Sequence, residues 1–347
     1  MKYKAISADG HVNEPPDLWT SRLPAKFKDR GPHVIETPNT HGDAWIMEGQ
    51  TRPSPMGGSS VNYRGQRFDR KTLGDKFLTV KNRGVRYEDI FPGSWDPQAR
   101  VKEMTEDHTD AEVMFNGVQT VWNALKLCKD HELALACYKV YNDWITEFQE
   151  AAPERFICNG TLPTTGIDDC IEEMHRCAKM GLRTVQLEAY PSGDFKNPSA
   201  EDDRFWAAAV EIGMPVNVHT QFFFNTGDLG GNVGRADDEV MSKLKAKNLF
   251  GLDVEAGRFP SILGRMIGSG VFERFPDLNF VGTEVQIGWV PYFLQQYDES
   301  VIRNRQDWKL SMLPSEYFRR NVTGLHRRRG WRRQPVRHRC RQDHVGP

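Results

Sequence analysis

The chain has 347 residues, of which 38% are hydrophobic and 27% are charged, so it can bury a large core as one barrel or as two ordinary domains. It contains no run of about 18 apolar residues, which excludes a transmembrane helix. Its N-terminus also lacks the apolar stretch of a signal peptide. These features predict a cytoplasmic protein that does not associate with a membrane.

The predicted elements begin with a short strand at residues 3–8, which is followed directly by Asp9 and His11. Residues 13–95 are rich in proline and glycine and contain several turn signals. We interpret this region as an insertion that lies over one end of the barrel, with a β-hairpin at residues 43–48. It is not expected to fold as a separate domain.

From residue 96 onward, strands and helices are predicted to alternate, which is the pattern of a parallel sheet covered by helices. Further strands are predicted at residues 112–116, 155–162, 184–188, 215–219 and 279–284. Helices are predicted at residues 96–110, 125–151, 167–180, 201–212 and 288–300, with helical pieces at 238–273. No GxGxxG sequence follows the first strand, which argues against a dinucleotide-binding fold. The sequence favours an α/β fold of the (β/α)8 TIM barrel type over an open doubly wound sheet.

Polar side chains stand where predicted strands end, namely Asp9, His11, Glu188, His219 and Glu284. In a barrel the carboxyl ends of the strands meet at one mouth, which is where such enzymes place their chemistry. Asp9 and His11 lie two residues apart, so both project to the same side of the chain. The sequence therefore predicts one polar site at the barrel mouth.

Carboxylate and imidazole groups together suit Zn²⁺ or Mn²⁺, and an open coordination position would activate a water molecule or a substrate oxygen. We predict one divalent metal ion, Zn or Mn, held by Asp9, His11 and His219, with Glu14 as a further candidate ligand. A purely structural alternative exists for each residue alone. Asp9 would then cap a turn, and His219 would be a hydrogen-bonded histidine of the core.

Glu284 and His219 are the candidate catalytic residues. As a site residue, Glu284 would either hydrogen-bond to a metal ligand or act as a general acid or base. The alternative is that Glu284 is a carboxylate in a structural salt bridge. Glu188 is a weaker candidate for the substrate pocket. Phe222 and Phe223 follow His219 closely and predict the wall of an apolar or aromatic substrate pocket, with core packing as the alternative.

The chain resembles the amidohydrolase-related family in three segments: ISADGHVNEPPDLW, PVNVHT and SGVFERFPDLNFVGTEVQIGWVPYFLQQYDE. This family includes aminocarboxymuconate semialdehyde decarboxylase and the aromatic-acid decarboxylases, and the resemblance covers about residues 1–320. It implies a distorted (β/α)8 barrel with one divalent metal ion at its C-terminal mouth. It further implies decarboxylation of a small aromatic or muconate-type acid, or hydrolysis of a small substrate, and is compatible with a homodimer.

By this resemblance, Asp9 and His11 match the ligand pair of the first strand, which is often His-x-His in the family, and Glu14 follows in the same loop. His219 matches the ligand of the fifth strand. Glu284 occupies the sixth-strand position where decarboxylases of this group often have a catalytic histidine, which leaves decarboxylation and hydrolysis both open. The remaining family ligand, an aspartate at the end of the eighth strand, has no counterpart in this sequence.

The last 23 residues differ from the rest of the chain. Residues 325–347 contain eight Arg and one Asp, a charge of +7 without histidine, so the preceding 324 residues carry −8 of the total of −1. One interpretation is a non-catalytic barrel remnant or binding protein with a basic, nucleic-acid-binding tail. The other is a frameshift near residue 324 in a GC-rich gene, because synonymous codons exist for which a one-base shift reads FIDDGVGAASRYDIGVDKIMWA. The acidic body favours the frameshift, so nucleic acid is not an expected partner.

A frameshift at this point would remove the eighth strand together with its aspartate. The first strand would then lack a hydrogen-bonding neighbour, which leaves an open edge on the sheet. The sequence therefore predicts an aberrant, disordered tail at residues 325–347, weak metal binding and an impaired enzyme. Sequencing the source gene tests the reading frame directly.

Overall fold

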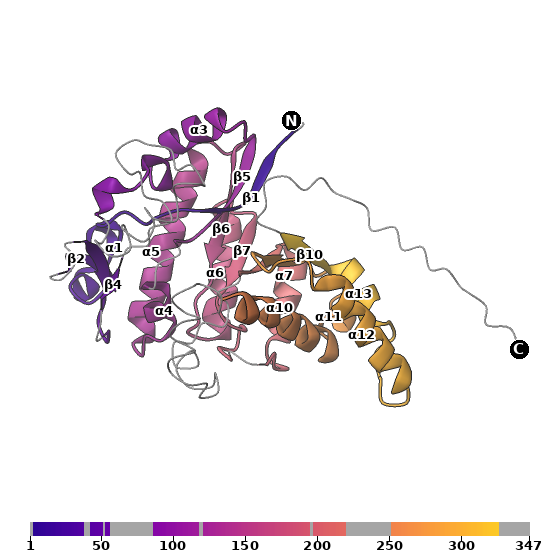
Figure 1. Ribbon diagram of the computed structural model, residues 1–347. Coiled ribbons are helices and arrows are strands. Elements are labelled where there is room, and N and C mark those ends of the chain that lie inside the picture. Colours follow the sequence, from indigo (N-terminus) through magenta and orange to yellow (C-terminus); the bar gives the residue numbers. More distant parts are fainter. Residues whose placement is uncertain are drawn as a thin grey trace, which may run out of the picture.

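A seven-stranded parallel sheet forms the centre of the protein (Figure 1). The structure is a computed structural model that describes residues 3–37, 42–50, 53–55, 86–117, 121–194, 197–219 and 251–325. The strands, in spatial order, are β1 (Ile6–His11), β5 (Ala111–Phe115), β6 (Phe156–Thr161), β7 (Thr184–Leu187), β8 (Val216–His219), β9 (Phe280–Thr283) and β10 (Val322–Leu325). Because spatial order follows chain order, the sheet curls as a half-barrel and lacks the order reversal of a doubly wound fold. The predicted α/β fold of the distorted TIM-barrel type is confirmed.

Helices alternate with these strands. They are α3 (Pro97–Glu106), α4 (Val121–Lys126), α5 (His131–Glu150), α6 (Ile167–Lys179), α7 (Asp203–Glu211), α10 (Gly251–Gly268), α11 (Val271–Arg274), α12 (Val290–Arg303) and α13 (Pro314–Asn321). The Asp96 carboxylate accepts hydrogen bonds from two first-turn amides of α3, with Pro97 at the first position. Gly181 and Gly213 follow α6 and α7 in the left-handed region, with φ of 97° and 66°, which ends both helices as predicted.

Two predicted elements need correction. The single helix expected at residues 125–151 is wrong, because the chain forms two helices, α4 and α5, and the Asp130 side chain caps the second by accepting a hydrogen bond from the Leu133 amide. The sequence also predicted six strands, whereas β10 is a seventh. Leu325 pairs with Thr283 in β9, so the ordered sheet reaches one residue into the predicted tail. Residues 326–347 lie outside the described part of the chain.

The described part of the insertion contains a small antiparallel sheet of β2 (His33–Glu36), β3 (Asp43–Ile46) and β4 (Ser54–Pro55). The hairpin expected at residues 43–48 is present, with β2 as the partner of β3. Helix α1 (Leu18–Arg22) carries Trp19, whose indole donates to the Cys137 carbonyl at 3.0 Å and meets the rings of Trp45 and Trp122. The insertion therefore packs on α4 and α5, the two helices that follow β5 (Figure 1).

Strands β1 and β10 form the two edges of the large sheet within the described residues. An open edge beside β1 is what the sequence predicted, although the structure does not test its proposed cause in the gene. Among the helices of the described ranges, none combines the length and the apolar character that crossing a lipid bilayer requires.

Candidate metal centre

Asp9 and His11 stand on an irregular part of β1. Ser7 pairs with Glu112, whereas Gly10, three residues further on, pairs only two residues further along β5. This extra residue is a β-bulge, a feature that re-aims side chains next to active sites. The Ser7 hydroxyl donates to Glu112 Oε1 at 2.9 Å, and a Cβ at Gly10 would overlap the same carboxylate. Ser7 and Gly10 thus face Glu112, while Asp9 and His11 face the other side of the sheet.

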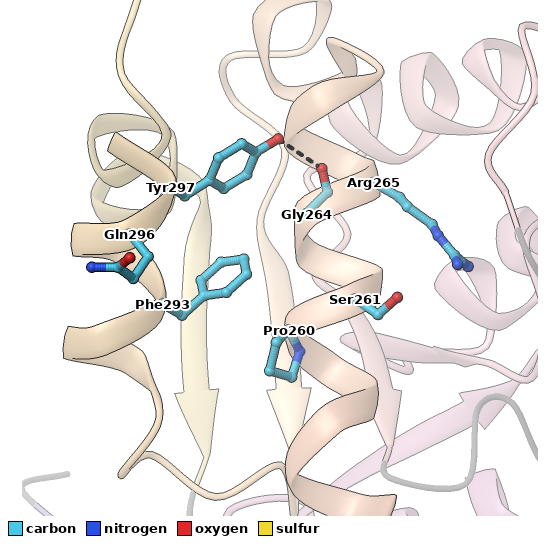
Figure 2. A pocket seen from close by; sticks show the side chains of 7 residues that line it. All are labelled: Pro260, Ser261, Gly264, Arg265, Phe293, Gln296 and Tyr297. Carbon is cyan, nitrogen blue, oxygen red and sulfur yellow. Dashed lines mark hydrogen bonds between the residues drawn. The ribbon is translucent and has the colours of Figure 1, made fainter. Parts of the chain in front are cut away.

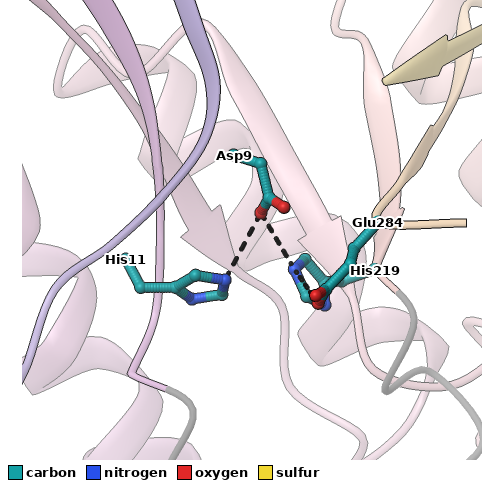
Figure 3. Close-up of side chains that lie close together, drawn as sticks. All are labelled: Asp9, His11, His219 and Glu284. Carbon is teal, nitrogen blue, oxygen red and sulfur yellow. Dashed lines mark hydrogen bonds and ion pairs between the residues drawn. The ribbon is translucent and has the colours of Figure 1, made fainter. Parts of the chain in front are cut away.

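Four side chains converge at the C-terminal ends of β1, β8 and β9, and they are Asp9, His11, His219 and Glu284 (Figure 3). One ligand atom from each lies within 4.8 Å of the others. Asp9 Oδ1 is 3.4 Å from His11 Nε2 and 3.3 Å from His219 Nε2. Glu284 Oε2 is 3.7 Å from His219 Nε2. We call these four residues the metal group, and it unites three of the four predicted ligands with the predicted catalytic carboxylate.

The spacing within the metal group fits a divalent ion. Its N···O distances of 3.3, 3.4 and 3.7 Å are long for hydrogen bonds, whose N···O distances are most often about 2.9–3.0 Å. Ligand atoms bound about 2.1 Å from a tetrahedral ion would be roughly 3.4 Å apart. Asp9 Oδ2 is also buried and has no hydrogen-bond partner among the described residues. Two imidazoles and two carboxylates are ligand types that suit Zn²⁺ or Mn²⁺.

The surroundings orient the imidazoles. His11 Nδ1 lies 2.7 Å from the Asn116 carbonyl oxygen, so this nitrogen donates the hydrogen bond, and Nε2 is the nitrogen that faces the metal group. The rings of His11 and His219 meet edge-on with centroids 4.9 Å apart. Phe115 packs 5.2 Å from the His219 ring and gives the group an apolar wall.

Asp9 is held in its ionised form. Burial alone raises the pKa of this carboxyl, but hydrogen bonds and charge interactions with His11 and His219 outweigh burial and hold the pKa well below its usual range. The carboxylate is therefore available as a ligand without first losing a proton.

Glu14 lies outside the metal group. Its Oε1 accepts hydrogen bonds from the Gly117 amide at 2.8 Å and from the Trp122 indole at 3.0 Å. The side chain is buried, and burial raises its pKa above the usual value. In this structure Glu14 ties the loop after β1 to the loop after β5, which is a different role from the predicted one of metal ligand.

Replacing Glu14 with glutamine is expected to make stability less dependent on pH. The raised folded-state pKa means that the contribution of Glu14 is fully present below its unfolded pKa near 4.5 and is lost as the pH rises through the folded value. The amide cannot ionise, so the free energy of unfolding of the variant should fall less above pH 4.5 than that of the wild type. Urea titrations at several pH values measure this difference, and parallel pH profiles for the two proteins would contradict it.

Glu188, predicted for the substrate pocket, forms a buried ion pair with Lys126 at the end of α4. It also accepts a hydrogen bond from the Gln186 side chain, whose Nε2 lies 3.4 Å from Asn116 Oδ1. A polar chain thus runs from this ion pair to the residue whose carbonyl orients His11. The sequence analysis missed Lys126 and Gln186, because a lysine inside a predicted helix and a glutamine inside a strand carry no signal of their own.

The remaining predicted pocket residues, Phe222 and Phe223, lie outside the described residues. A separate pocket lies between α10 and α12 and is lined by Pro260, Ser261, Gly264, Arg265, Phe293, Gln296 and Tyr297 (Figure 2). The Tyr297 hydroxyl donates to the Gly264 carbonyl at 3.1 Å across it. This pocket shares no residue with the metal group, and neither a carboxylate nor an imidazole lines it.

A parallel half-barrel with imidazoles and carboxylates at its strand ends places its polar side chains where barrel enzymes carry their active sites. The sequence profile of the amidohydrolase family matches residues 89–339, and the chain belongs to this family. A relative, 2-amino-3-carboxymuconate-6-semialdehyde decarboxylase of Dictyostelium discoideum, is 29% identical over 198 residues, which are 56% of this chain and 49% of the relative. The chain thus spans about half the length of this relative.

Solved structures of low sequence identity share the fold. An amidohydrolase from Mycobacterium avium subsp. paratuberculosis K-10 superposes with a TM-score of 0.65 at 21% identity, covering 94% of this chain and 83% of that chain. A 5-carboxyvanillate decarboxylase variant from Novosphingobium aromaticivorans DSM 12444, with bound manganese and 3-methoxy-4-hydroxy-5-nitrobenzoic acid, superposes with a TM-score of 0.55 at 16% identity, covering 93% and 79%. The family resemblance seen in the sequence is confirmed.

Proposed function

We propose that this protein is a metal-dependent carboxy-lyase that removes carbon dioxide, without oxidation, from a small aromatic or cyclic acid. The metal group at the ends of β1, β8 and β9 is the observation that carries the proposal. The names of the relatives support the substrate class, since one is a carboxymuconate-type decarboxylase and another is a decarboxylase crystallised with a benzoic acid. Hydrolysis of a small substrate is the second candidate, favoured by Glu284 at the position where the family resemblance leads one to expect a histidine.

The bound metal ion would supply Lewis-acid chemistry, polarising a substrate oxygen. Asp9, His11 and His219 would hold it, and the Asn116 carbonyl fixes the ring of His11 so that Nε2 faces inward. Phe115 packs against the ring of His219 and gives it an apolar neighbour. Loss of the carboxyl group as carbon dioxide leaves an electron pair on carbon, which takes up one proton, so the reaction balances without an oxidant or reductant.

The proposal is tested by assaying the manganese-loaded protein with a panel of acids that includes 2,6-dihydroxybenzoate and 5-carboxyvanillate. Release of one carbon dioxide per molecule of product is expected, lost on treatment with a chelator and restored by Mn²⁺. Cleavage of ester, amide or lactone substrates without release of carbon dioxide would instead establish the hydrolase. A protein that holds Mn²⁺ firmly and still turns over neither class would contradict both candidates.

The out-of-frame origin of the Arg-rich ending also stays a proposal, as does the impairment of the enzyme that it would cause. The profile match of the family continues to residue 339, which lies within this ending. The nucleotide sequence of the gene around codon 324 decides the point. An unbroken frame whose codons do not permit the shifted reading would reject it.

A further inference from the structure

We propose that Glu284 is a metal ligand in this protein, so that two imidazoles and two carboxylates from β1, β8 and the turn after β9 form the whole coordination set. The inference rests on the proposed metal-dependent function and assigns to Glu284 a role different from acid–base catalysis. The family resemblance alone implies that Glu284 stands where relatives have a catalytic residue. It also implies that the fourth metal ligand is an aspartate of the eighth strand.

The geometry places Glu284 on the open side of the metal group. Its Oε2 atom is 3.7 Å from His219 Nε2, close to the spacing of roughly 3.4 Å expected between neighbouring ligands of one ion. Its side chain is 22% exposed, against 5% for Asp9 and 3% for His219. Glu284 is therefore the more exposed carboxylate of the group and Asp9 the more buried one, and both point toward His219 (Figure 3).

The backbone at this position supports a role for the side chain. Glu284 has φ of 56°, in the left-handed region where glycine is the residue of least strain, and Gln286 repeats this conformation with φ of 57°. Strained residues of this kind cluster at active sites and ligand clamps. The turn aims the Glu284 carboxylate at His219, because His219 and Thr283 are paired neighbours at the ends of β8 and β9.

Charge balance points the same way. Asp9 and Glu284 place two carboxylates within 4.8 Å of each other, and a divalent cation between them would offset the repulsion of their negative charges. His11 Nδ1 donates a hydrogen bond to the Asn116 carbonyl, so Nε2 is the ring nitrogen that faces the group. One divalent cation would balance the two carboxylates. No residue beyond β10 is then needed to hold the ion.

The test is titration of chelator-treated full-length protein with Mn²⁺ in a calorimeter, together with the Glu284→Gln and Glu147→Gln variants. The wild type is expected to bind one ion. Glu284→Gln should weaken the affinity at least about 10-fold, since loss of an outer-shell partner already costs that much. Glu147→Gln is the matched control and should leave the affinity unchanged, because Glu147 is a surface residue on α5, 56% exposed and paired with Arg22. The electron paramagnetic resonance spectrum of bound Mn²⁺ should change only in the first variant.

The outcomes separate this inference from the proposed function. If Glu284→Gln binds Mn²⁺ as tightly as the wild type and loses only turnover, Glu284 is an acid–base residue and the inference is overturned while the function stands. If the wild type binds no ion, the four residues do not form a complete coordination set, so the inference fails together with the metal-dependent function of the chain as it stands. Glu284→Asp keeps the negative charge, but its shorter side chain places the carboxylate further from the metal group. Its affinity should lie between those of wild type and Glu284→Gln, and wild-type affinity in both variants would also overturn the assignment.

Discussion

Replacing Lys126 with methionine is expected to lower the free energy of unfolding by about 3–5 kcal/mol. The Lys126 and Glu188 side chains are 1% and 3% exposed, so solvent screens neither charge. The methionine removes the ammonium and leaves the Glu188 carboxylate uncompensated in the interior, with the Gln186 amide as its remaining partner among the described residues. Urea unfolding followed by circular dichroism measures the loss.

The double variant Lys126→Met/Glu188→Gln separates the charge effect from packing. It removes both charges and keeps an acceptor for the Gln186 amide, so it is expected to be more stable than Lys126→Met alone. Lys26→Met is the surface control, because Lys26 and Glu132 are 64% and 75% exposed and such pairs contribute at most about 1 kcal/mol. Equal losses in the single and double variants would show that the buried charge does not set the stability.

Replacing His219 with alanine is expected to reduce the affinity for Mn²⁺ by about 100-fold or more and to abolish turnover. Loss of an outer-shell partner costs about 10- to 100-fold, and loss of a ligand should cost more. His219 is central to the metal group, because its Nε2 lies 3.3 Å from Asp9 and 3.7 Å from Glu284. Metal content after dialysis and calorimetric titration measure the effect.

His175 on α6 is exposed and serves as the control for loss of an imidazole. His175→Ala should retain the metal and the activity of the wild type. A normal metal content in His219→Ala would show that the ion, if present, is held elsewhere.

The position of most site residues follows from sequence, because parallel strands bring their carboxyl ends to one mouth. Asp9, His11 and His219 were placed together on this argument, and the structure has them within hydrogen-bonding or ligand distance of one another. The choice between Glu14 and Glu284 could not be made in the same way. Glu14 is held outside the metal group by hydrogen bonds from the Gly117 amide and the Trp122 indole. Glu284 reaches the group because its backbone is in the left-handed region.

The missed elements have similarly local causes. The apolar pattern of residues 125–151 continues across the break between α4 and α5, so periodicity alone did not reveal the cap at Asp130. Strand β10 has only four residues and is followed by an Arg-rich segment. Four residues are too short a pattern to be recognised as a strand without knowledge of the partner strand β9. Its pairing with β9 is a tertiary contact that no local signal encodes.

The bulge in β1 decides which face of the strand carries the metal group. If the chain from Ser7 to His11 alternated regularly, Asp9 and His11 would lie on the same side as Ser7, which faces Glu112. The extra residue between Ser7 and Gly10 shifts the alternation by one position and turns both candidate ligands to the opposite side. Straightening this strand would therefore withdraw two candidate ligands from the centre in one step, although every functional side chain would still be present. The phase of β1 is thus as necessary to metal binding as the ligands themselves.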